Sequence, residues 1–433
     1  MKKIKTFRDP IHNIITIDKD DEKLLLDLID TREFQRLRHI KQLGLSSFTY
    51  PGAEHTRFGH SLGVVCLTKR FIDKIITLKG IDKKYIEELK DYRILALAVA
   101  LLHDIGHGPF SHALEKTTKV KHERWTIEII TGDTEINKIL EDHRNGFSKE
   151  VAGIIRRTHD SKAIVKILSS QLDTDRIDYL LRDSKLTGAF YGTFDLEWMI
   201  NCLKIGEVGG DIEVGLDESK GFCIAEDFIM ARYYMYVNVY FHRTTRSAEL
   251  IMDKIFERVS ELEKEGTVVL SEDLSEILNK GFKKETLNNF LNLTDNTIWH
   301  FINQWSDNED MILSDLCNRL LRRNLFKEIP IEEDLLGFYK RAVEICNQND
   351  IDEEFYLLRD EASSNWYKDS YISQKPLDED DEAEMEASEQ IFLFDKKGNS
   401  TELASKSKII NQIRNERIVI ERMYAPEEVK KLF

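Results

Sequence analysis

The sequence is poor in the residues that interrupt regular structure, with 6 Pro and 21 Gly among 433 residues. Because the strands of a sandwich or barrel need turn residues roughly every 8 to 12 positions, this scarcity favours long helices over a many-stranded β fold. Cysteine is also scarce, and its five residues show no paired spacing that would indicate a disulfide framework or a cysteine zinc site. This usage fits a reducing cytoplasm.

Long apolar runs are absent as well. No run of 18 apolar residues occurs, and no apolar stretch follows the basic first five residues, so we expect neither a membrane span nor a secretory signal. Acidic residues outnumber basic ones by 78 to 62, which gives a formal charge of -16. Such a field repels nucleic acid, so an anionic ligand has to be held by a local cluster of Arg, Lys or metal.

The apolar periodicity predicts a mainly α protein. Asp30-Thr31 offers an N-cap, and the apolar run 94–102 predicts a helix at the centre of the core. Residues 6–17 predict a strand or arm, residues 205–222 a small inserted hairpin, and residues 391–394 a strand. Further helices are predicted for residues 34–43, 58–79, 173–183, 227–258, 315–325, 335–346 and 403–417.

Composition divides the chain into four parts. Residues 1–270 are expected to form the core, and residues 271–377 a more charged helical extension. Residues 378–390 are rich in acids and are interpreted as a linker or loop, because a dense run of like charges favours a solvated segment. Residues 391–433 are expected to form a small α+β appendage.

Histidines gather in one part of the sequence, where six of the twelve lie between His55 and His122. His103 and Asp104 directly follow the apolar run 94–102, and ionisable groups at a core boundary are costly unless they are paired or metal-bound. Neighbours on a helix point about 100° apart, so an ion shared by both needs further ligands from other helices. His60 and Asp175 are the candidates.

Each candidate also has a purely structural interpretation. A single histidine such as His60 is more often a satisfied core residue than a ligand. Residues 173–183 also fit an ordinary amphipathic helix, with Ile177 and Leu180 turned inward and the charged residues in water. On the residues alone, both interpretations remain open.

The ordered series His60, His103-Asp104 and Asp175 resembles the H…HD…D signature of the HD-domain metal-dependent phosphohydrolases. Over residues 5–330 the chain more narrowly resembles the deoxynucleoside triphosphate triphosphohydrolases, to which the mammalian SAM-and-HD-domain enzyme belongs. This implies that the core is an HD-domain helical bundle that hydrolyses dNTPs to deoxynucleoside and inorganic triphosphate. The matching motifs are Asp9-Pro10-Ile11-His12, residues 34–38, 41–44, 50–53, 57–58 and 60–64, and residues 103–112.

The resemblance implies that one divalent cation is held by His60, His103, Asp104 and Asp175. Two imidazoles and two carboxylates suit Mn, Fe, Zn, Co or Ni, whereas Mg is expected, if present, with the nucleotide phosphates. The residues after the metal motif are implied as acid–base and water-orienting groups, with Glu115 directed at His107 or His122. Packing of a turn beside Phe110 is the structural alternative for His112. The implied catalytic residues are His107, His112, Glu115 and His122.

The resemblance also implies contacts with the substrate. Guanidinium groups would hold the phosphates, and the edge of Tyr240 would exclude a 2′-hydroxyl. A plain surface stripe is the alternative for Arg232, Tyr236, Tyr240 and Arg243, which recur at helical spacing on one face. The phosphate residues are Arg57, Arg176 and Arg232, and the sugar residues are Tyr240, Tyr179 and Asp183 with Gln42 and Leu43 beside them.

A second nucleotide site is implied by residues that resemble a guanine-reading allosteric set and a phosphate clamp from another subunit. One carboxylate can accept two N–H bonds from a guanine edge, and the helix N-cap is the alternative for Asp30. The expected partners are a dNTP substrate, a guanine-nucleotide activator and further copies of the chain in a homotetramer. The guanine-reading residues are Asp30, Gln35 and Arg38, and the clamp is Arg323 and Lys327.

Two other functions remain open from the sequence. One is an HD phosphohydrolase that acts on another nucleotide or phosphate ester, and the other is a nucleotide-sensing regulator without turnover. Identifying the released product would separate the first from a triphosphohydrolase. Bound dNTP that is never converted would indicate the second.

Overall fold

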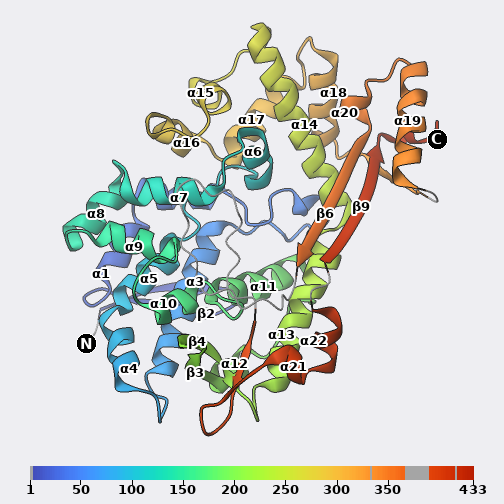
Figure 1. Ribbon diagram of the computed structural model, residues 1–433. Helices are drawn as coiled ribbons and strands as arrows, with labels where there is room; N and C mark the ends of the chain where they lie inside the picture. Colours follow the sequence, from blue (N-terminus) through green and yellow to red (C-terminus); the bar gives the residue numbers. More distant parts are fainter. Residues whose placement is uncertain (1–2, 332–333, 366–389, 415–416) are drawn as a thin grey trace.

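The computed structural model describes residues 3–331, 334–365, 390–414 and 417–433 (Figure 1). Within these ranges helices dominate and the strands form three small sheets, so the expectation of a mainly helical fold with small sheets is confirmed. The acidic segment 378–390 lies outside the described residues except for Gln390.

The helices differ widely in length, from single turns to the 23 residues of α14. Short 3-10 turns span Leu37–His39, Ser46–Phe48 and Lys284–Thr286, and a π-helical turn spans Tyr236–Tyr240. The helices are α1 (Lys23–Ile29), α2 (Arg32–Arg36), α3 (Arg57–Ile75), α4 (Lys83–Asp91), α5 (Arg93–Leu102), α6 (Ser111–Thr118), α7 (His122–Thr131), α8 (Glu135–His143), α9 (Phe147–Ile155), α10 (Lys162–Leu168), α11 (Thr174–Thr187), α12 (Leu196–Cys202), α13 (Phe222–Met235), α14 (Arg243–Glu265), α15 (Glu272–Lys280), α16 (Leu287–Asn292), α17 (Asp295–Trp305), α18 (Met311–Leu321), α19 (Leu335–Gln348), α20 (Glu353–Tyr356), α21 (Leu403–Lys406), α22 (Lys408–Ile413) and α23 (Glu427–Lys430).

The apolar helix α5 occupies the centre of the core, as predicted from the run 94–102. Every residue from Leu95 to Leu102 is buried, because the Leu, Val and Ala side chains leave no polar face to turn toward water. The longer helix α3 packs against both α5 and α11. The three helices α3, α5 and α11 therefore pack together, and His103 directly follows the end of α5.

The first predicted helix is shorter than expected. It ends at Arg36 and continues as a 3-10 turn only to His39, instead of reaching Leu43. The Thr31 hydroxyl accepts a hydrogen bond from the Phe34 N–H and caps α2. Asp30 instead lies at the C-terminal end of α1 with a helical backbone, so its interpretation as the N-cap is wrong.

The single helix predicted for residues 227–258 is interrupted. α13 runs into the π-helical turn Tyr236–Tyr240, and α14 starts afresh with His242 as its N-cap, where Nδ1 accepts from the Thr244 N–H at 3.2 Å. The stripe that was predicted to continue from Tyr240 to Arg243 on one helix face is therefore broken. Arg243 lies beyond the break, 3.8 Å from the Glu328 carboxylate.

The strands connect distant parts of the chain. The N-terminal stretch predicted as a strand or arm is an antiparallel hairpin, and the hairpin predicted within residues 205–222 is present as β3 and β4. β7 adds to β4 in parallel, and β9 lies between β5 and β6. Residues 391–433 thus complete two sheets built with earlier strands, and the helix predicted for 403–417 is two short helices. The strands are β1 (Ile4–Asp9), β2 (Asn13–Asp18), β3 (Leu203–Val208), β4 (Asp211–Asp217), β5 (Lys327–Ile329), β6 (Leu358–Asn365), β7 (Phe392–Phe394), β8 (Ser400–Glu402) and β9 (Arg417–Ala425).

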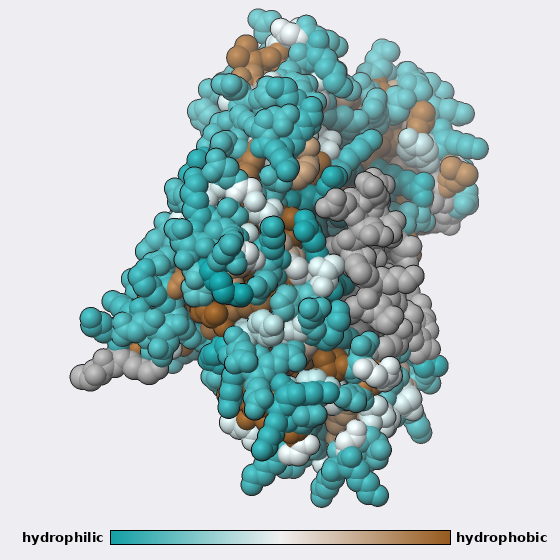
Figure 2. Space-filling model, turned by 60° about the vertical axis from the view of Figure 1, so that its left-hand side comes forward, coloured by the Kyte–Doolittle hydropathy of each residue, from teal (hydrophilic) through white to brown (hydrophobic). Residues whose placement is uncertain are grey.

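Charged and polar residues cover most of the face drawn in Figure 2, with apolar residues in small patches. This agrees with a composition in which 32% of residues are charged. Among the described residues, none of the helices has both the length and the apolar character needed to cross a bilayer.

The packing of α3 on α11 leaves no room for a side chain at Gly63. An added methyl group would lie 1.9 Å from Asp178 Oδ1 and 2.4 Å from Arg182 Nη2. We expect Gly63→Ala to lower the free energy of unfolding by about 1–3 kcal/mol in urea denaturation, because both neighbours are buried. Gly59→Ala, one turn earlier, is the control, since its methyl group would lie 3.6 Å from Arg182 Nη1. Equal losses in both variants would contradict this packing.

Candidate active site

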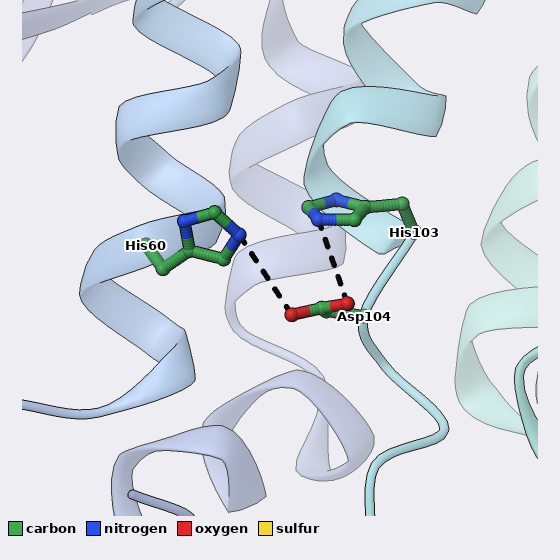
Figure 3. Close-up of side chains that lie close together, drawn as sticks. All are labelled: His60, His103 and Asp104. Carbon is green, nitrogen blue, oxygen red and sulfur yellow. Dashed lines mark ion pairs between the residues drawn. The ribbon is translucent and has the colours of Figure 1, made fainter. Parts of the chain in front are cut away.

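Three of the predicted metal ligands converge where α3 meets the end of α5 (Figure 3). His60 lies in the first turns of α3, and His103 and Asp104 follow α5 directly. His60 Nε2 is 3.8 Å from Asp104 Oδ2, and His103 Nε2 is 3.6 Å from Asp104 Oδ1. One ligand atom from each residue lies within 4.8 Å of the others, which is a spacing that can hold a metal ion.

The fourth predicted ligand faces the same point from α11. Asp175 lies in the first turn of this helix, which Asp173 caps. Its Oδ1 is 3.0 Å from His60 Nε2 and 3.6 Å from His103 Nε2. Three separate elements therefore bring together the two imidazoles and two carboxylates that the resemblance implied as metal ligands.

Hydrogen bonds fix the direction of both imidazoles. His60 Nδ1–H donates to Asp178 Oδ2 at 2.8 Å, and His103 Nδ1–H donates to the Ala100 carbonyl at 2.9 Å. The Nε2 atoms of both rings are buried and make no hydrogen bond to the described residues. Buried nitrogen atoms of this kind, turned toward carboxylates, fit the direct ligands of a divalent cation.

The charges at this centre are tightly coupled. Burial lowers the pKa of His60, but its contacts with Asp175 and Asp178 outweigh burial and raise the pKa to about 10. Burial opposes ionisation of Asp104, but the charges of Arg57 and His103 hold the pKa of its carboxyl well below the usual range. A cation that binds His60 Nε2 thus takes the place of a proton, and the carboxylates are already ionised.

The predicted phosphate residue Arg57 also belongs to this centre. It begins α3, is buried, and its Nη1 lies 2.5 Å from Asp104 Oδ2. The structure thus pairs it with a metal ligand, one helical turn from His60. Its predicted contact with the phosphates would lie directly beside the metal centre.

A buried network behind His60 was not assigned any role from the sequence. Asp178 accepts from His60, from His12 Nε2 at 2.7 Å, and from Arg182 Nε and Nη2 at 2.8 and 3.0 Å. Arg182 Nη1 also donates to Asp9 Oδ2 at 2.8 Å. The motif Asp9-Pro10-Ile11-His12 was visible in the sequence, but its connection to the metal centre depends on a contact across more than 160 positions.

The predicted acid–base residues adjoin the metal centre through Asp104. His107 Nε2 lies 3.3 Å from Asp104 Oδ1, and the His107 ring stacks on His122 with centroids 3.7 Å apart. His122 Nδ1 donates to Glu115 Oε1 at 2.8 Å, so the structure pairs Glu115 with His122, one of the two histidines that the resemblance implied as its partner. His112 lies on α6, and its side chain is outside the described part of the structure.

Burial, then the charges of Arg57 and His122, hold the pKa of His107 well below its usual value. His107 is therefore neutral near pH 7 and can accept a proton or a hydrogen bond beside Asp104. The Glu115–His122 pair has the geometry of a carboxylate that orients an imidazole for proton transfer.

Several of the predicted phosphate and sugar residues lie on α11, on α13 and in the π-helical turn that follows α13. Arg176 Nη1 and Arg232 Nη1 both donate to Gln171 Oε1, at 3.1 and 2.8 Å. Asp183 accepts from the Tyr240 hydroxyl at 2.8 Å. Gln171, which accepts from both arginines, was missed from the sequence because it belongs to no motif.

The other residues of the predicted sugar site lie around this pair. His55 Nε2 contacts Asp183 Oδ1 at 2.7 Å, and the Tyr179 ring meets the Tyr240 ring edge-on with centroids 6.4 Å apart. The Gln42 N–H donates to the His55 carbonyl at 2.9 Å, and half-buried Leu43 follows it.

The contacts that the structure shows for the residues predicted for guanine recognition do not include the metal ligands. Asp30 lines a surface groove of about 670 Å³ together with Asp27, Glu135 and Asp142. Gln35 accepts from Arg38 Nε at 2.8 Å, and the Arg38 guanidinium lies 3.5 Å from the centroid of the Phe58 ring.

The predicted clamp residues are on the surface. Arg323 is exposed and donates from Nε to the Phe48 carbonyl at 2.9 Å, and Lys327 is exposed on β5. Guanine recognition, the intersubunit clamp and the tetramer stay predictions.

The chain is similar to known proteins over nearly its whole length. A family model of the HD domain matches residues 57–183. An uncharacterized protein of Bacillus subtilis, YwfO, is 40% identical over 98% of this chain and 93% of its own length. The crystal structure of a phosphohydrolase from Bacteroides thetaiotaomicron covers 98% of this chain and 100% of that one, with 30% identity and a TM-score of 0.78. A deoxynucleoside triphosphate triphosphohydrolase SAMHD1 homolog of Dictyostelium discoideum is 30% identical over 59% of this chain and 49% of its own length.

The hydrogen-bond network behind His60 predicts that a substitution at Asp178, which is not itself a predicted metal ligand, changes metal affinity. In Asp178→Asn, one amide group replaces the carboxylate that orients His60, so we expect metal affinity to fall by roughly 10- to 100-fold in a competition titration with a chelator. Asp183→Asn on the same helix is the matched control, because its side chain contacts no metal ligand in the structure. His12→Gln removes one of the ring partners of Asp178 and should give a smaller loss. Unchanged metal affinity in folded Asp178→Asn would contradict this role.

Proposed function

The chain belongs to the HD-domain phosphohydrolases, and we propose that it hydrolyses deoxynucleoside triphosphates to a deoxynucleoside and inorganic triphosphate. The proposal is supported chiefly by one observation, the order of chemical groups along α11. Asp175 faces the metal ligands, Arg176 follows as a cation, and Asp183 is bonded to Tyr240 two turns later. The name of the Dictyostelium relative describes the same activity for that protein.

The residues present can divide the chemistry of this reaction among them. A divalent cation held by His60, His103, Asp104 and Asp175 would supply Lewis acidity toward a phosphate oxygen and an attacking water. Arg57 beside Asp104 can stabilise negative charge that develops on the α-phosphate.

Proton transfer falls to the histidines that adjoin this centre. In the proposed reaction the Glu115–His122 pair, with neutral His107 stacked on it, takes the proton from water. The bond from the α-phosphorus to the 5′ oxygen breaks, the triphosphate keeps the oxygen from water, and the 5′ oxygen takes up a proton. His112 was predicted as a member of this acid–base set and keeps that proposed role.

Recognition of the sugar is proposed for the opposite end of the α11 face. The Tyr240 hydroxyl is fixed by Asp183, so the ring cannot swing away without breaking that bond. A fixed aromatic edge next to C2′ rejects a ribose hydroxyl by collision, and Asp183 can accept from a 3′-hydroxyl.

The first test measures metal, turnover and product together. We expect His103→Ala and Asp104→Ala to lose both bound metal and dNTP hydrolysis, because each removes a ligand from the buried set. Wild-type protein incubated with dNTPs, monophosphates and cyclic nucleotides should release inorganic triphosphate from dNTPs. Pyrophosphate or phosphate as the product would instead indicate an HD hydrolase of another ester, and tight dNTP binding without product would indicate a regulator. Full activity in a variant without metal would exclude the proposal.

The second test separates the ring of Tyr240 from its hydroxyl. We expect Tyr240→Ala to narrow the ratio of kcat/KM for dATP over ATP by at least about tenfold, because the excluding edge is gone. Tyr240→Phe keeps the ring and should retain most of that discrimination. Equal ratios in wild type and Tyr240→Ala would place the sugar contact elsewhere.

A further inference from the structure

A buried carboxylate that was given no role from the sequence connects two loops of the site. Asp295 begins α17 and is 2% exposed. Its Oδ2 accepts from the Lys41 N–H at 2.8 Å, and its Oδ1 accepts from the Phe110 N–H at 3.0 Å. Lys41 directly precedes Gln42 of the predicted sugar site, and Phe110 lies three residues after His107. Asp295 therefore joins the sugar side of the site to its acid–base side.

The Lys41 segment is also held by bonds that do not involve Asp295. The Arg57 N–H donates to the Ile40 carbonyl at 3.0 Å, and Lys41 pairs with Thr56 in an antiparallel bridge. These contacts attach the segment to the beginning of α3, the helix that carries one of the predicted metal ligands. One oxygen of the Asp295 carboxylate is thus bound to a segment fixed on the metal centre, and the other oxygen presents an acceptor at a fixed place.

The backbone of Phe110 is strained and is held by α17. Its φ of 47° lies in the left-handed region, which residues other than glycine adopt rarely and which persists where the surroundings hold it. Asp295 binds the Phe110 N–H, and the Trp299 ring, about one turn along α17, meets the Phe110 ring edge-on with centroids 5.7 Å apart. Phe110 directly precedes α6, which carries Glu115. Helix α17 therefore fixes the point from which α6 starts.

A buried arginine binds the other end of the same loop. Arg36 is 5% exposed, and it donates from Nη1 to the His107 carbonyl at 2.8 Å and from Nε to the Leu293 carbonyl at 3.0 Å. Burial lowers the pKa of Arg36 to about 9, and the charge of nearby Asp295 opposes this shift. The backbone of residues 107–110 is thus bound at both ends to residues 293–295, once through Arg36 and once through Asp295.

We propose that Asp295 and Arg36 are positioning residues, which hold the loop 107–110 so that His107 and Glu115 stay at a set place beside the metal ligands. Both act through the backbone of this loop. The proposal deepens the proposed function and rests on it for the acid–base roles of His107 and of the Glu115–His122 pair. A displacement of about 1 Å in groups that transfer protons can cost about 100-fold in rate, even when the change lies outside the reacting groups.

The kinetic experiment compares two substitutions of aspartate by asparagine. In Asp295→Asn an amide group replaces one acceptor oxygen and cannot accept from a backbone N–H. We expect kcat for dNTPs to fall roughly 10- to 100-fold while KM and metal content stay at the wild-type level, because other contacts hold the metal ligands and the Lys41 segment. Asp310→Asn is the matched control, since Asp310 also starts a helix, accepts from the Leu313 N–H at 2.8 Å and pairs with Arg258. Wild-type kcat in folded Asp295→Asn, or an equal loss in Asp310→Asn, would overturn the proposal.

A second variant tests the other end of the loop and carries the test if Asp295→Asn does not fold. Arg36→Lys keeps the positive charge, but a single ammonium group cannot reproduce the fork that joins the His107 and Leu293 carbonyls. We expect kcat to fall again with KM and metal content unchanged. Wild-type kcat in folded Arg36→Lys would also overturn the proposal.

Hydrogen exchange distinguishes this proposal from the proposed function, because it needs no substrate. At equal metal content, amides of residues 107–118 should exchange faster in Asp295→Asn than in wild type or Asp310→Asn. If wild type hydrolyses no dNTP but only Asp295→Asn shows this faster exchange, the positioning of the loop stands and the proposed function fails. Unchanged exchange in Asp295→Asn, together with intact dNTP turnover, would leave the proposed function standing and remove Asp295 from the site.

Discussion

The metal centre depends on how one buried carboxylate, Asp178, is neutralised. It accepts hydrogen bonds from His60, His12 and Arg182, which come from α3, the loop between β1 and β2, and α11 itself. Removing one partner of a buried charge costs about 3–5 kcal/mol, so these three segments are held together by the same charge that orients the His60 ring. Gly63 is required at the crossing because even a methyl group would collide with this carboxylate. The position of a metal ligand is thus set by residues that do not touch the metal site.

Helix α11 then sets the spacing between the chemical groups. Asp175 and Arg176 are adjacent, Tyr179 lies about one turn later and Asp183 a further turn later, and a rise of 1.5 Å per residue separates Asp175 from Asp183 by about 12 Å. The proposed metal ligand, phosphate contact and sugar contacts therefore follow one another along the helix in the order of the parts of a nucleotide. Because all four belong to one rigid helix, the distances between them do not depend on loop conformation.

The sequence could predict the parts of this site whose residues lie close together along the chain. His103-Asp104 stands out because it follows an apolar run, and the contrast between buried and ionisable residues is visible without a structure. The roles of Asp178, His55 and Gln171 could not be predicted, since each depends on contacts between residues far apart in the chain. A neutral amide such as Gln171 gives no charge signal even though it joins two arginines.

The fold shows the same division between local and non-local information. Helical periodicity found α5 and α11, but it continues unchanged through residues 236–242, where the crowded rings of Tyr236, Tyr240 and Phe241 accompany a π-helical turn and a new N-cap. The parallel pairing of β4 with β7 joins residues more than 170 positions apart, which no local pattern specifies. Thr31 rather than Asp30 caps α2 because the backbone at Asp30 already continues the end of α1.

The acidic balance of the chain and its arginine-lined site are compatible because they act over different distances. At physiological ionic strength the Debye length is about 8 Å, so the field of the net charge of -16 is largely screened beyond about that distance from the surface. Arg176 and Arg232 act at hydrogen-bond distance around buried Gln171, where screening by salt is weak. An anionic ligand therefore gains little from long-range attraction and much from direct contact.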